Sequence, residues 1–324
     1  MHFIIYGAGG IGATIGARLF QQGEQVTLIA RGAHKERLQA EGLKFVSPDG
    51  QVQLSIPTVG HPEELDLNDS NAFVMLCMKS QHTEDALRAV AGRLHQQAGI
   101  TCVQNGVANE RMSLRYFKNT YATVVNLPAM HLEPGEVVTH ATGVGGILDT
   151  GCYPGGVDAR AEVVTQALTK AGFSAEPDGR VMRQKYAKLL VNLGNIVQAG
   201  FKEGEDTKRI TKVMRDEALA CYEAGGIDCA SRDEVRDRRA AGYRLEDIPG
   251  YERTAGSSWQ SLARGTGDIE TEFLNGEISL LGRLHGVDTP YNDAAVEIAR
   301  RSVTQSLGPR YFSQNDFMTI AHQL

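Results

Sequence analysis

The sequence predicts an α/β domain followed by an all-helical domain, and three observations support this prediction. The first thirty-one residues contain an apolar run, a glycine turn, a helix-forming stretch and a second apolar run, which is the order of a strand-helix-strand unit. Short apolar runs alternate with helix-forming stretches as far as residue 178, whereas the chain from Gly179 onward has no convincing strand and is typical of long helices. The length of 324 residues exceeds that of one ordinary core. We therefore expect two domains, residues 1–176 and residues 177–324.

A glycine-rich run joins the first predicted strand, residues 2–6, to the first helix, and its members are Gly7, Ala8, Gly9, Gly10, Ile11 and Gly12. Its first, third and sixth residues have the G-x-G-x-x-G spacing. In that motif the first glycine makes a tight turn, the second lets the backbone approach a pyrophosphate, and the third lets the helix pack on the strand. The helix N-terminus then offers free N–H groups to phosphates. With a second apolar run at residues 26–30, the motif predicts a Rossmann-type domain in which these six residues bind a dinucleotide.

The second predicted strand ends in Arg31. A domain that binds NAD usually places an acidic residue near this position to hold the ribose 2′-hydroxyl, whereas an arginine suits the 2′-phosphate of NADP. Lys35 and Arg37 add positive charge nearby. The alternative is that Arg31 simply ends a strand in solvent. Because position, sign of charge and the missing carboxylate agree, we predict NADP(H) as the cofactor.

Composition excludes several other classes of protein. Hydrophobic residues make up 42% and charged residues 22% of the chain, as in soluble globular proteins. The net charge of -6 does not indicate a nucleic-acid binder, which would carry a concentrated basic surface. The apolar N-terminal stretch is interrupted by glycines and has no basic region before it, so we expect no signal peptide, no membrane span and a cytoplasmic location. The five cysteines form no C-x-x-C pair, which favours reduced thiols and no metal site.

The remaining elements of the first domain follow from apolar runs and turn signals. Pro48-Asp49-Gly50 predicts a hairpin between the flanking apolar segments. The expected helices are 34–41, 83–94 and 161–171, and the expected strands are 43–46, 52–56, 72–78, 100–103, 120–125, 137–140, 143–148 and 173–178, with the sheet becoming more antiparallel from residue 137 onward.

Polar residues follow two of these buried strands. Lys79 comes after the strand at 72–78, and Asn105 comes after the strand at 100–103. The carboxyl ends of strands are where an open α/β sheet binds ligands. The alternatives are that Lys79 is a solvated strand end and that Asn105, which precedes a glycine, only supplies a residue that tolerates positive φ. Asn105 is also well placed to contact a nicotinamide or a substrate.

The second domain is expected to contain helices over 180–198, 206–223, 268–285 and 292–304, with a further helix opening at Ser257. The segment 232–239 carries mixed charges at nearly every position, which is typical of a solvated helix face. The segment 242–253 contains Pro249-Gly250 and is expected to be a loop.

A polar stripe marks the first of these helices. Lys188, Asn192 and Asn195 are spaced at i, i+4 and i+7 on a helix that is otherwise largely apolar. Such a stripe must face water, pair internally or line a cavity. A surface row would be broader and more charged, so we favour a cavity. Desolvation in a partly dry cleft lowers the pKa of a lysine and lets it donate a proton to a carbonyl oxygen as hydride reaches the carbon.

Two further positions have both a functional and a structural interpretation. Glu270 could pair with the ammonium of Lys188, but a carboxylate in the first turn of a helix is also favoured by the helix dipole. Ser257 and Ser258 open a helix before Trp259, and capping alone would explain one of them.

These motifs occur in the order seen in ketopantoate reductases, and the chain resembles that family over nearly its whole length. The matching elements are the glycine turn with Arg31, Met78-Lys79, Gln104-Asn105-Gly106, Lys188-Leu189 with Asn192, Ser257-Ser258, and Glu270 followed by Phe273-Leu274-Asn275-Gly276. The resemblance implies a Rossmann domain, an all-helical second domain and NADPH-dependent reduction of a 2-oxo acid, 2-dehydropantoate or a related branched one, as in pantothenate biosynthesis.

The resemblance also implies roles for single residues. Lys188 would be the proton donor, and Asn192 and Ser258 would bind the substrate. Lys79, Asn105 and Glu270 would contact the cofactor, with Asn105 near the substrate too.

The chain departs from the family pattern where the substrate is recognised. The family typically has an Asn-Pro pair at the positions of Ile196 and Val197, and a second asparagine-bearing loop where this chain has Phe201-Lys202-Glu203-Gly204. Asn195 points about 100° away from the expected asparagine. Because lost hydrogen-bond donors reduce discrimination, the type of reaction is better predicted than the substrate. The alternative function is a non-catalytic NADPH-binding sensor or interaction protein on the same fold.

The sequence leaves the oligomeric state open. Apolar positions at Leu274, Leu280 and Leu284 favour either a homodimer through the helical domain or an intrachain core.

Overall fold

The computed structural model describes residues 1–253, 256–263, 265 and 269–323. The chain forms two compact units. The first contains residues 1–104, 109–184 and 232–253, and the second contains residues 105–108, 185–231 and 254–324. Each unit therefore draws on separate stretches of the chain. The expected division after residue 176 stays a prediction.

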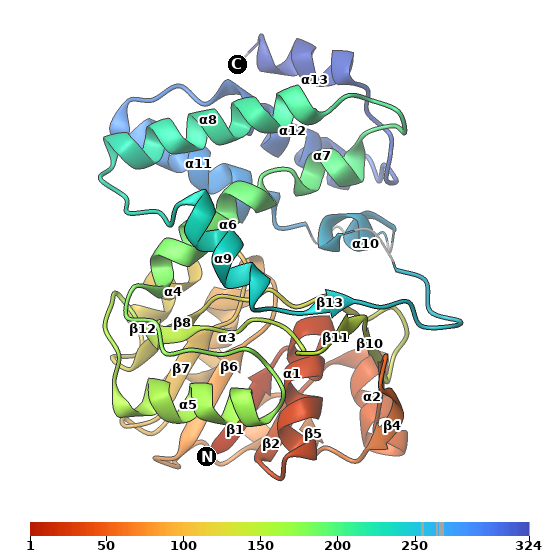
Figure 1. The fold of residues 1–324 in the computed structure, drawn as a ribbon, viewed down its shortest axis with the longest axis vertical. Helices are drawn as coiled ribbons and strands as arrows, with labels where there is room; N and C mark the ends of the chain where they lie inside the picture. The colour runs from red at the N-terminus through yellow and green to blue at the C-terminus, as the bar shows by residue number, and fades with distance from the viewer. Residues whose placement is uncertain (254–255, 264, 266–268, 324) are drawn as a thin grey trace. The chain divides into compact units, whose positions relative to one another are not determined.

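A seven-stranded sheet organises the first unit (Figure 1), in the order β12-β8-β7-β6-β1-β2-β5. The bounds are β1 His2–Tyr6, β2 Gln25–Ile29, β5 Thr58–Val59, β6 Ala72–Leu76, β7 Gly99–Cys102, β8 Thr120–Thr123 and β12 Thr150–Cys152. All neighbours are parallel except β12, which runs antiparallel to β8. The six parallel strands have the order of a Rossmann fold, and their order reverses between β1 and β6. The predicted α/β fold class is confirmed.

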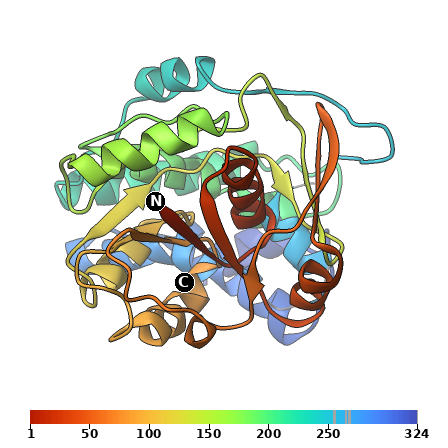
Figure 2. The same cartoon turned by 90° about the horizontal axis from the view of Figure 1, so that it is seen from below.

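The central strand β1 is buried on both faces. Phe3 and Ile5 contribute to one apolar cluster, and Ile4 and Tyr6 contribute to another. A parallel strand covered on both sides needs a continuous apolar run, which is why residues 3–6 show no polar alternation. The first cluster includes residues of α1 (Gly10–Gln21) and α5 (Ala159–Lys170), and the second includes residues of α3 (Thr83–Val90). Figure 2 shows these helices on opposite faces of the sheet.

The first unit also contains a smaller sheet, in the order β4-β3-β10-β9. Its strands are β3 Leu43–Ser47, β4 Gly50–Leu54, β9 Ala129–Met130 and β10 Glu136–Thr139. β3 and β4 form the predicted hairpin, with Ser47 paired to Gly50. The other elements of this unit are α2 Gly32–Glu41, η1 Pro62–Glu64, η2 Ser80–His82, α4 Asn109–Leu114 and β11 Ala141–Thr142.

The predicted continuation of the main sheet through residues 137–148 is wrong. β10 pairs with β3 and β9 in the smaller sheet. Residues 143–148 form no strand, and Ile147 makes isolated bridges to Asn126 and Ser174. Gly143 and Gly146 have φ of +83° and +156°, which an extended ladder does not accommodate.

The second unit is helical. Its helices are α7 Asn195–Gly200, α8 Lys208–Ala224, α10 Ser257–Ala263, α11 Thr271–His285, α12 Pro290–Thr304 and α13 Gln314–Ala321, and α6 Val181–Asn192 enters it at Lys185. In α11, Leu274 is buried, whereas Leu280 and Leu284 are exposed. Within the described residues, none of the helices has the length and apolar character that crossing a membrane requires.

The single helix expected over residues 180–198 is interrupted. α6 ends at Asn192 and α7 begins at Asn195. Gly194 lies in the break, and glycine is a poor helix former. The carbonyl of Leu193 accepts a hydrogen bond from the side-chain amide of Asn275 at 3.2 Å. The glycine and this side-chain contact together explain why the helix stops.

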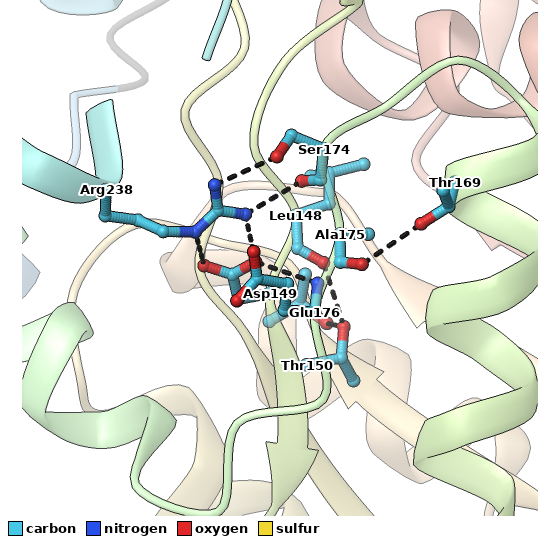
Figure 3. A network of polar contacts seen from close by, with 9 residues as sticks. Leu148, Asp149, Thr150, Thr169, Ser174, Ala175, Glu176 and Arg238 are labelled. Atoms are coloured by element: carbon cyan, nitrogen blue, oxygen red, sulfur yellow. Dashed lines mark hydrogen bonds and ion pairs between the residues drawn. The ribbon is translucent and has the colours of Figure 1, made fainter. Parts of the chain in front are cut away.

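The charged segment after α8 belongs to the first unit. It forms α9 (Arg232–Ala240). The segment 242–253, which was expected to be a loop, contains the short strand β13 (Arg244–Leu245), which pairs with β11 although no strand was expected beyond residue 179. Figure 3 shows Arg238 of α9 contacting Asp149 and Ser174. The Arg238 guanidinium donates from Nε to Asp149 Oδ2 at 2.7 Å and from Nη1 to Ser174 Oγ at 2.9 Å.

The expectation of a solvated helix face is therefore wrong for Arg238. Its side chain is 16% exposed, and that of Asp149 is 5% exposed. The hydrogen bond to Asp149 is the main reason that the pKa of Arg238 is raised. The pattern of alternating charges could not predict this contact, because Asp149 lies 89 residues from Arg238 in the sequence.

Candidate active site

The glycine turn after β1 is shaped by close backbone contacts. A Cβ added to Gly7, whose φ is +99°, would lie 2.6 Å from the backbone nitrogen of Met78. A Cβ added to Gly12 would lie 2.3 Å from the carbonyl oxygen of Gly7. A Cβ at Gly9 would meet nothing within 4 Å. The first and third glycines are thus required by packing, whereas the second leaves open space at the position where the motif admits a pyrophosphate.

The N-terminus of α1 suits an anion. Gly9 is the N-cap residue and provides no capping side chain, and residues 10–13 carry no acidic group. The N–H of Ala13 donates to the Gly9 carbonyl at 2.8 Å as the first bond of the helix. The N–H groups before it have no partner inside the helix, so they are available to a phosphate.

A histidine that the sequence did not single out supports this turn. His34, in the first turn of α2, contacts the Ala8 carbonyl through Nε2 at 2.7 Å and accepts a hydrogen bond from the Gly135 N–H through Nδ1 at 2.9 Å. These partners require a neutral imidazole protonated on Nε2. Burial, followed by the nearby His131, lowers the pKa of His34 to about 4. No motif or spacing marks this residue, because its partners are backbone atoms far apart in the sequence.

Arg31 lies just beyond β2 and caps the N-terminus of α2 with extended backbone geometry. Its side chain is exposed, whereas Lys35 is half-buried. Arg37 forms an ion pair with Glu41. Of the three predicted cationic residues, Arg31 therefore lies directly at the carboxyl end of the strand next to β1, where the cofactor ribose would be expected.

Lys79 follows β6 and precedes η2, and its side chain is half-buried. β6 is the strand that neighbours β1 at the reversal of strand order. The glycine turn reaches this strand end, since Gly7 packs against the backbone of Met78. Lys79 is thus next in sequence to the residue that contacts the glycine turn.

Within the second unit, Lys188 donates a hydrogen bond from Nζ to Asn105 Oδ1 at 2.7 Å. The positive φ in this loop is carried by Gly106, at +78°, and Asn105 has none. The alternative that Asn105 serves only as a turn residue is therefore wrong. A Cβ added to Gly106 would lie 2.9 Å from the Phe273 carbonyl, so the loop packs closely on the first turn of α11.

Asn192 lies one turn beyond Lys188 on α6 and is 9% exposed. Its Oδ1 atom is buried and has no hydrogen-bond partner among the described residues. A buried polar oxygen without a partner loses hydration without compensation, and a bound ligand is one way to satisfy it. Asn195 does not extend the stripe as predicted, because it begins a separate helix after the break.

The last two predicted site residues are Ser258, in α10, and Glu270, at the N-terminus of α11. Ser258 is buried on α10, which packs against α7. The side chain of Ser257 lies outside the described residues. Glu270 is the N-cap residue of α11, and its side chain makes no capping hydrogen bond. The structure thus places Glu270 at the N-terminus of α11, where the helix dipole favours a carboxylate, as in the structural interpretation of this residue.

Ile196 and Val197 are 1% and 2% exposed in α7. Gly200 of the same helix faces Ile196, Ile298 and Phe312, so this region is apolar core. The positions where the family pattern places Asn-Pro thus carry no polar group in this chain.

The described residues contain no group of three or more His, Cys, Asp or Glu that could hold a metal ion. All five cysteines are free thiols, and burial raises the pKa of Cys77.

Family models match both parts of the chain. The model described as "Ketopantoate reductase PanE/ApbA" matches residues 3–155, and the model described as "Ketopantoate reductase PanE/ApbA C terminal" matches residues 180–302. Among curated relatives, the 2-dehydropantoate 2-reductase of Archaeoglobus fulgidus is 28% identical over 91% of this chain and 96% of its own length. The enzyme of the same name from Halobacterium salinarum is 27% identical over 93% of this chain and 98% of its own.

Solved structures share the fold. A PanE/ApbA family ketopantoate reductase from Ralstonia eutropha has a TM-score of 0.77 at 26% identity, covering 94% of this chain and 99% of its own. A ternary structure of D-mandelate dehydrogenase with NADH and anilino(oxo)acetate has a TM-score of 0.79 at 22% identity, with the same coverage.

Proposed function

Because this chain belongs to the ketopantoate reductase family and is an oxidoreductase of that family, we propose that it reduces a 2-oxo acid to the 2-hydroxy acid with NADPH. The hydrogen bond from Lys188 to Asn105 at 2.7 Å carries this proposal, because it holds an ammonium in a defined direction one helical turn before the buried Asn192. When bound, the reduced dinucleotide supplies the hydride.

The residues of the first unit fit a dinucleotide. The open space at Gly9 and the uncapped N-terminus of α1 support binding of the pyrophosphate by residues 7–12. Arg31 is the residue proposed to bind the 2′-phosphate, since a guanidinium forms paired hydrogen bonds with phosphate oxygens. Lys79, Asn105 and Glu270 are proposed to contact the cofactor.

Lys188 is proposed as the general acid. Its ammonium would donate a proton to the carbonyl oxygen of the substrate as the carbon becomes tetrahedral. Asn105 accepts a hydrogen bond from this ammonium at 2.7 Å, which gives the side chain of Lys188 a defined direction.

Asn192 and Ser258 are proposed to bind the substrate. The buried Oδ1 of Asn192 has no partner in the part of the chain that the structure describes, and leaving such an atom unpaired costs about 1–3 kcal/mol. A hydroxyl group on the ligand would satisfy it. Ser258 is buried and carries a hydroxyl that can donate to a carboxylate.

The substrate is proposed to be 2-dehydropantoate or a related branched 2-oxo acid, as the names of the relatives suggest. The apolar Ile196 and Val197 weaken the case for 2-dehydropantoate itself, because that substrate carries a distal hydroxyl group. The alternative function is a sensor without catalysis. That function would not require the hydrogen bond between Lys188 and Asn105. A homodimer stays a prediction.

The decisive experiment follows NADPH absorbance while the protein is presented with 2-dehydropantoate and a panel of branched and aromatic 2-oxo acids. Oxidation of NADPH with at least one of them is expected. Tight binding of NADPH without turnover of any acid would favour the sensor.

A further inference from the structure

The hydroxyl group of Thr83 is hydrogen-bonded to the residues at both ends of the loop between β7 and α4. Gln104 precedes Asn105 in this loop, and its Nε2 donates to Thr83 Oγ1 at 2.6 Å. Thr83 Oγ1 donates in turn to Asn109 Oδ1 at 2.8 Å. Thr83 is the first residue of α3 and is 0% exposed. Its hydroxyl thus connects the residue before the loop to the residue after it.

The same network reaches the loop that carries Lys79. Asn109 Nδ2 donates to Ser80 Oγ at 3.0 Å, and Ser80 follows Lys79 directly. Ser80, Gln104 and Asn109 are all buried. Hydrogen bonds in such a dry environment are strong, and a partner left unpaired there is costly. The network therefore sets the conformations of the loops that follow β6 and β7.

Catalysis by Lys188 depends on where Asn105 presents its side-chain oxygen, because the two atoms lie 2.7 Å apart. A displacement of about 1 Å in such a constellation can cost about a hundredfold in rate. We propose that Thr83 is a positioning residue, whose hydroxyl holds Gln104 and Asn109 so that the loop between them presents Asn105 to Lys188. This inference rests on the proposed function, in which Lys188 is the general acid.

The chain offers well-matched variants for a test. Thr83→Val keeps the shape of the side chain and removes the hydroxyl, and Thr83→Ser keeps the hydroxyl and removes the methyl group. Thr101→Val is the control. Thr101 is also 0% exposed in the first unit, and its hydroxyl is bonded to that of Thr123 at 2.8 Å. All three variants can be compared at equal folded fraction.

For Thr83→Val we expect kcat to fall by about tenfold. The dissociation constant for NADPH should rise by a smaller factor, because the glycine turn and Arg31 lie outside the network, whereas Lys79 and Asn105 lie in the loops that it holds. Thr83→Ser should recover most of kcat, and Thr101→Val should keep it. Hydrogen exchange measured by mass spectrometry should quicken in the segment 104–109 of Thr83→Val alone.

Two outcomes would overturn the proposal. One is unchanged exchange in segment 104–109 of Thr83→Val. The other is a kcat that stays at the wild-type value in Thr83→Val although its melting temperature falls like that of Thr101→Val, since this would assign Thr83 to stability alone. If the wild-type protein turns over no 2-oxo acid, the proposed function fails, but quicker exchange at 104–109 would still support the anchoring of the loop by Thr83.

Discussion

The glycine turn of the first unit and the lysine site of the second unit are built in different ways. The turn is made by backbone atoms within one short stretch, and its geometry is dictated by where a Cβ does not fit. The lysine site is made by side chains, and Lys188 and Asn105 are 83 residues apart in the sequence. A site built from backbone tolerates changes of side chain wherever there is room. A site built from distant side chains depends on every element that positions them.

Lys188→Ala should have the largest effect and tests the side-chain half of this comparison. Removing a general acid costs about 10²–10⁴-fold in kcat, whereas the affinity for NADPH should change little. Lys188→Arg should be nearly as inactive, because a guanidinium does not give up its proton. Steady-state kinetics and fluorescence titration with NADPH would measure both. Lys212→Ala, which changes an exposed lysine of α8, is the control. Substantial activity in Lys188→Ala would remove the assignment of this residue as the general acid.

The backbone half is tested by two alanine substitutions in one motif. Gly12→Ala forces a Cβ to within 2.3 Å of the Gly7 carbonyl and should lower the free energy of unfolding by about 1–3 kcal/mol. Gly9→Ala places its Cβ in open space and should leave thermal stability unchanged while it weakens NADPH binding. Melting curves with and without NADPH separate the two effects. Equal losses of stability in both variants would contradict the distinct roles given to these glycines.

Arg31→Ala sharpens the comparison within the first unit. It removes a side chain that is proposed to bind NADPH next to the glycine turn, which is proposed to bind NADPH through its backbone. Loss of a charge-assisted contact of about 1.5–3 kcal/mol should weaken NADPH binding by about ten- to a hundredfold and leave NADH binding nearly unchanged. Arg37→Ala is the matched control, since that guanidinium is already paired with Glu41. Similar losses for the two dinucleotides would exclude a contact with the 2′-phosphate.

His34→Phe should have the smallest effect, which is a change in how the melting temperature depends on pH. The pKa of His34 is about 4 in the folded protein and 6.5 in the unfolded chain, with burial as the main cause. The unfolded chain therefore binds more protons in this range, and the contribution of His34 is complete above about pH 6.5 and is lost as the pH falls toward 4. Melting temperatures across this range should fall less steeply for His34→Phe than for the wild type. His322→Gln, which changes an exposed histidine, should keep the wild-type slope.

Much of the fold could be predicted from the sequence because it is encoded locally. The continuous apolar run of residues 3–6 and the spacing of Gly7, Gly9 and Gly12 each report on their immediate surroundings. The hairpin around Pro48-Asp49-Gly50 was predicted for the same reason. The break after Asn192 was missed, because it depends on an amide 82 residues further along the chain.

The same distinction applies to the candidate site. Lys188 and Asn105 could be named from strand ends and helix spacing, but their contact could not. His34 and Thr83 had no signal at all, since their partners are backbone or side-chain groups from other elements. Asn195 was misplaced because the helical spacing used to align it assumed an unbroken helix.

The salt bridge of Arg238 with Asp149 determines how the protein can be divided. A polypeptide cut after residue 176 would retain Asp149 and lose Arg238, and with it the ion pair and the hydrogen bond from Arg238 to Ser174. It would also lose the segment that pairs β13 with β11. The nucleotide-binding half would therefore fold as an independent fragment only if residues 232–253 were supplied with it.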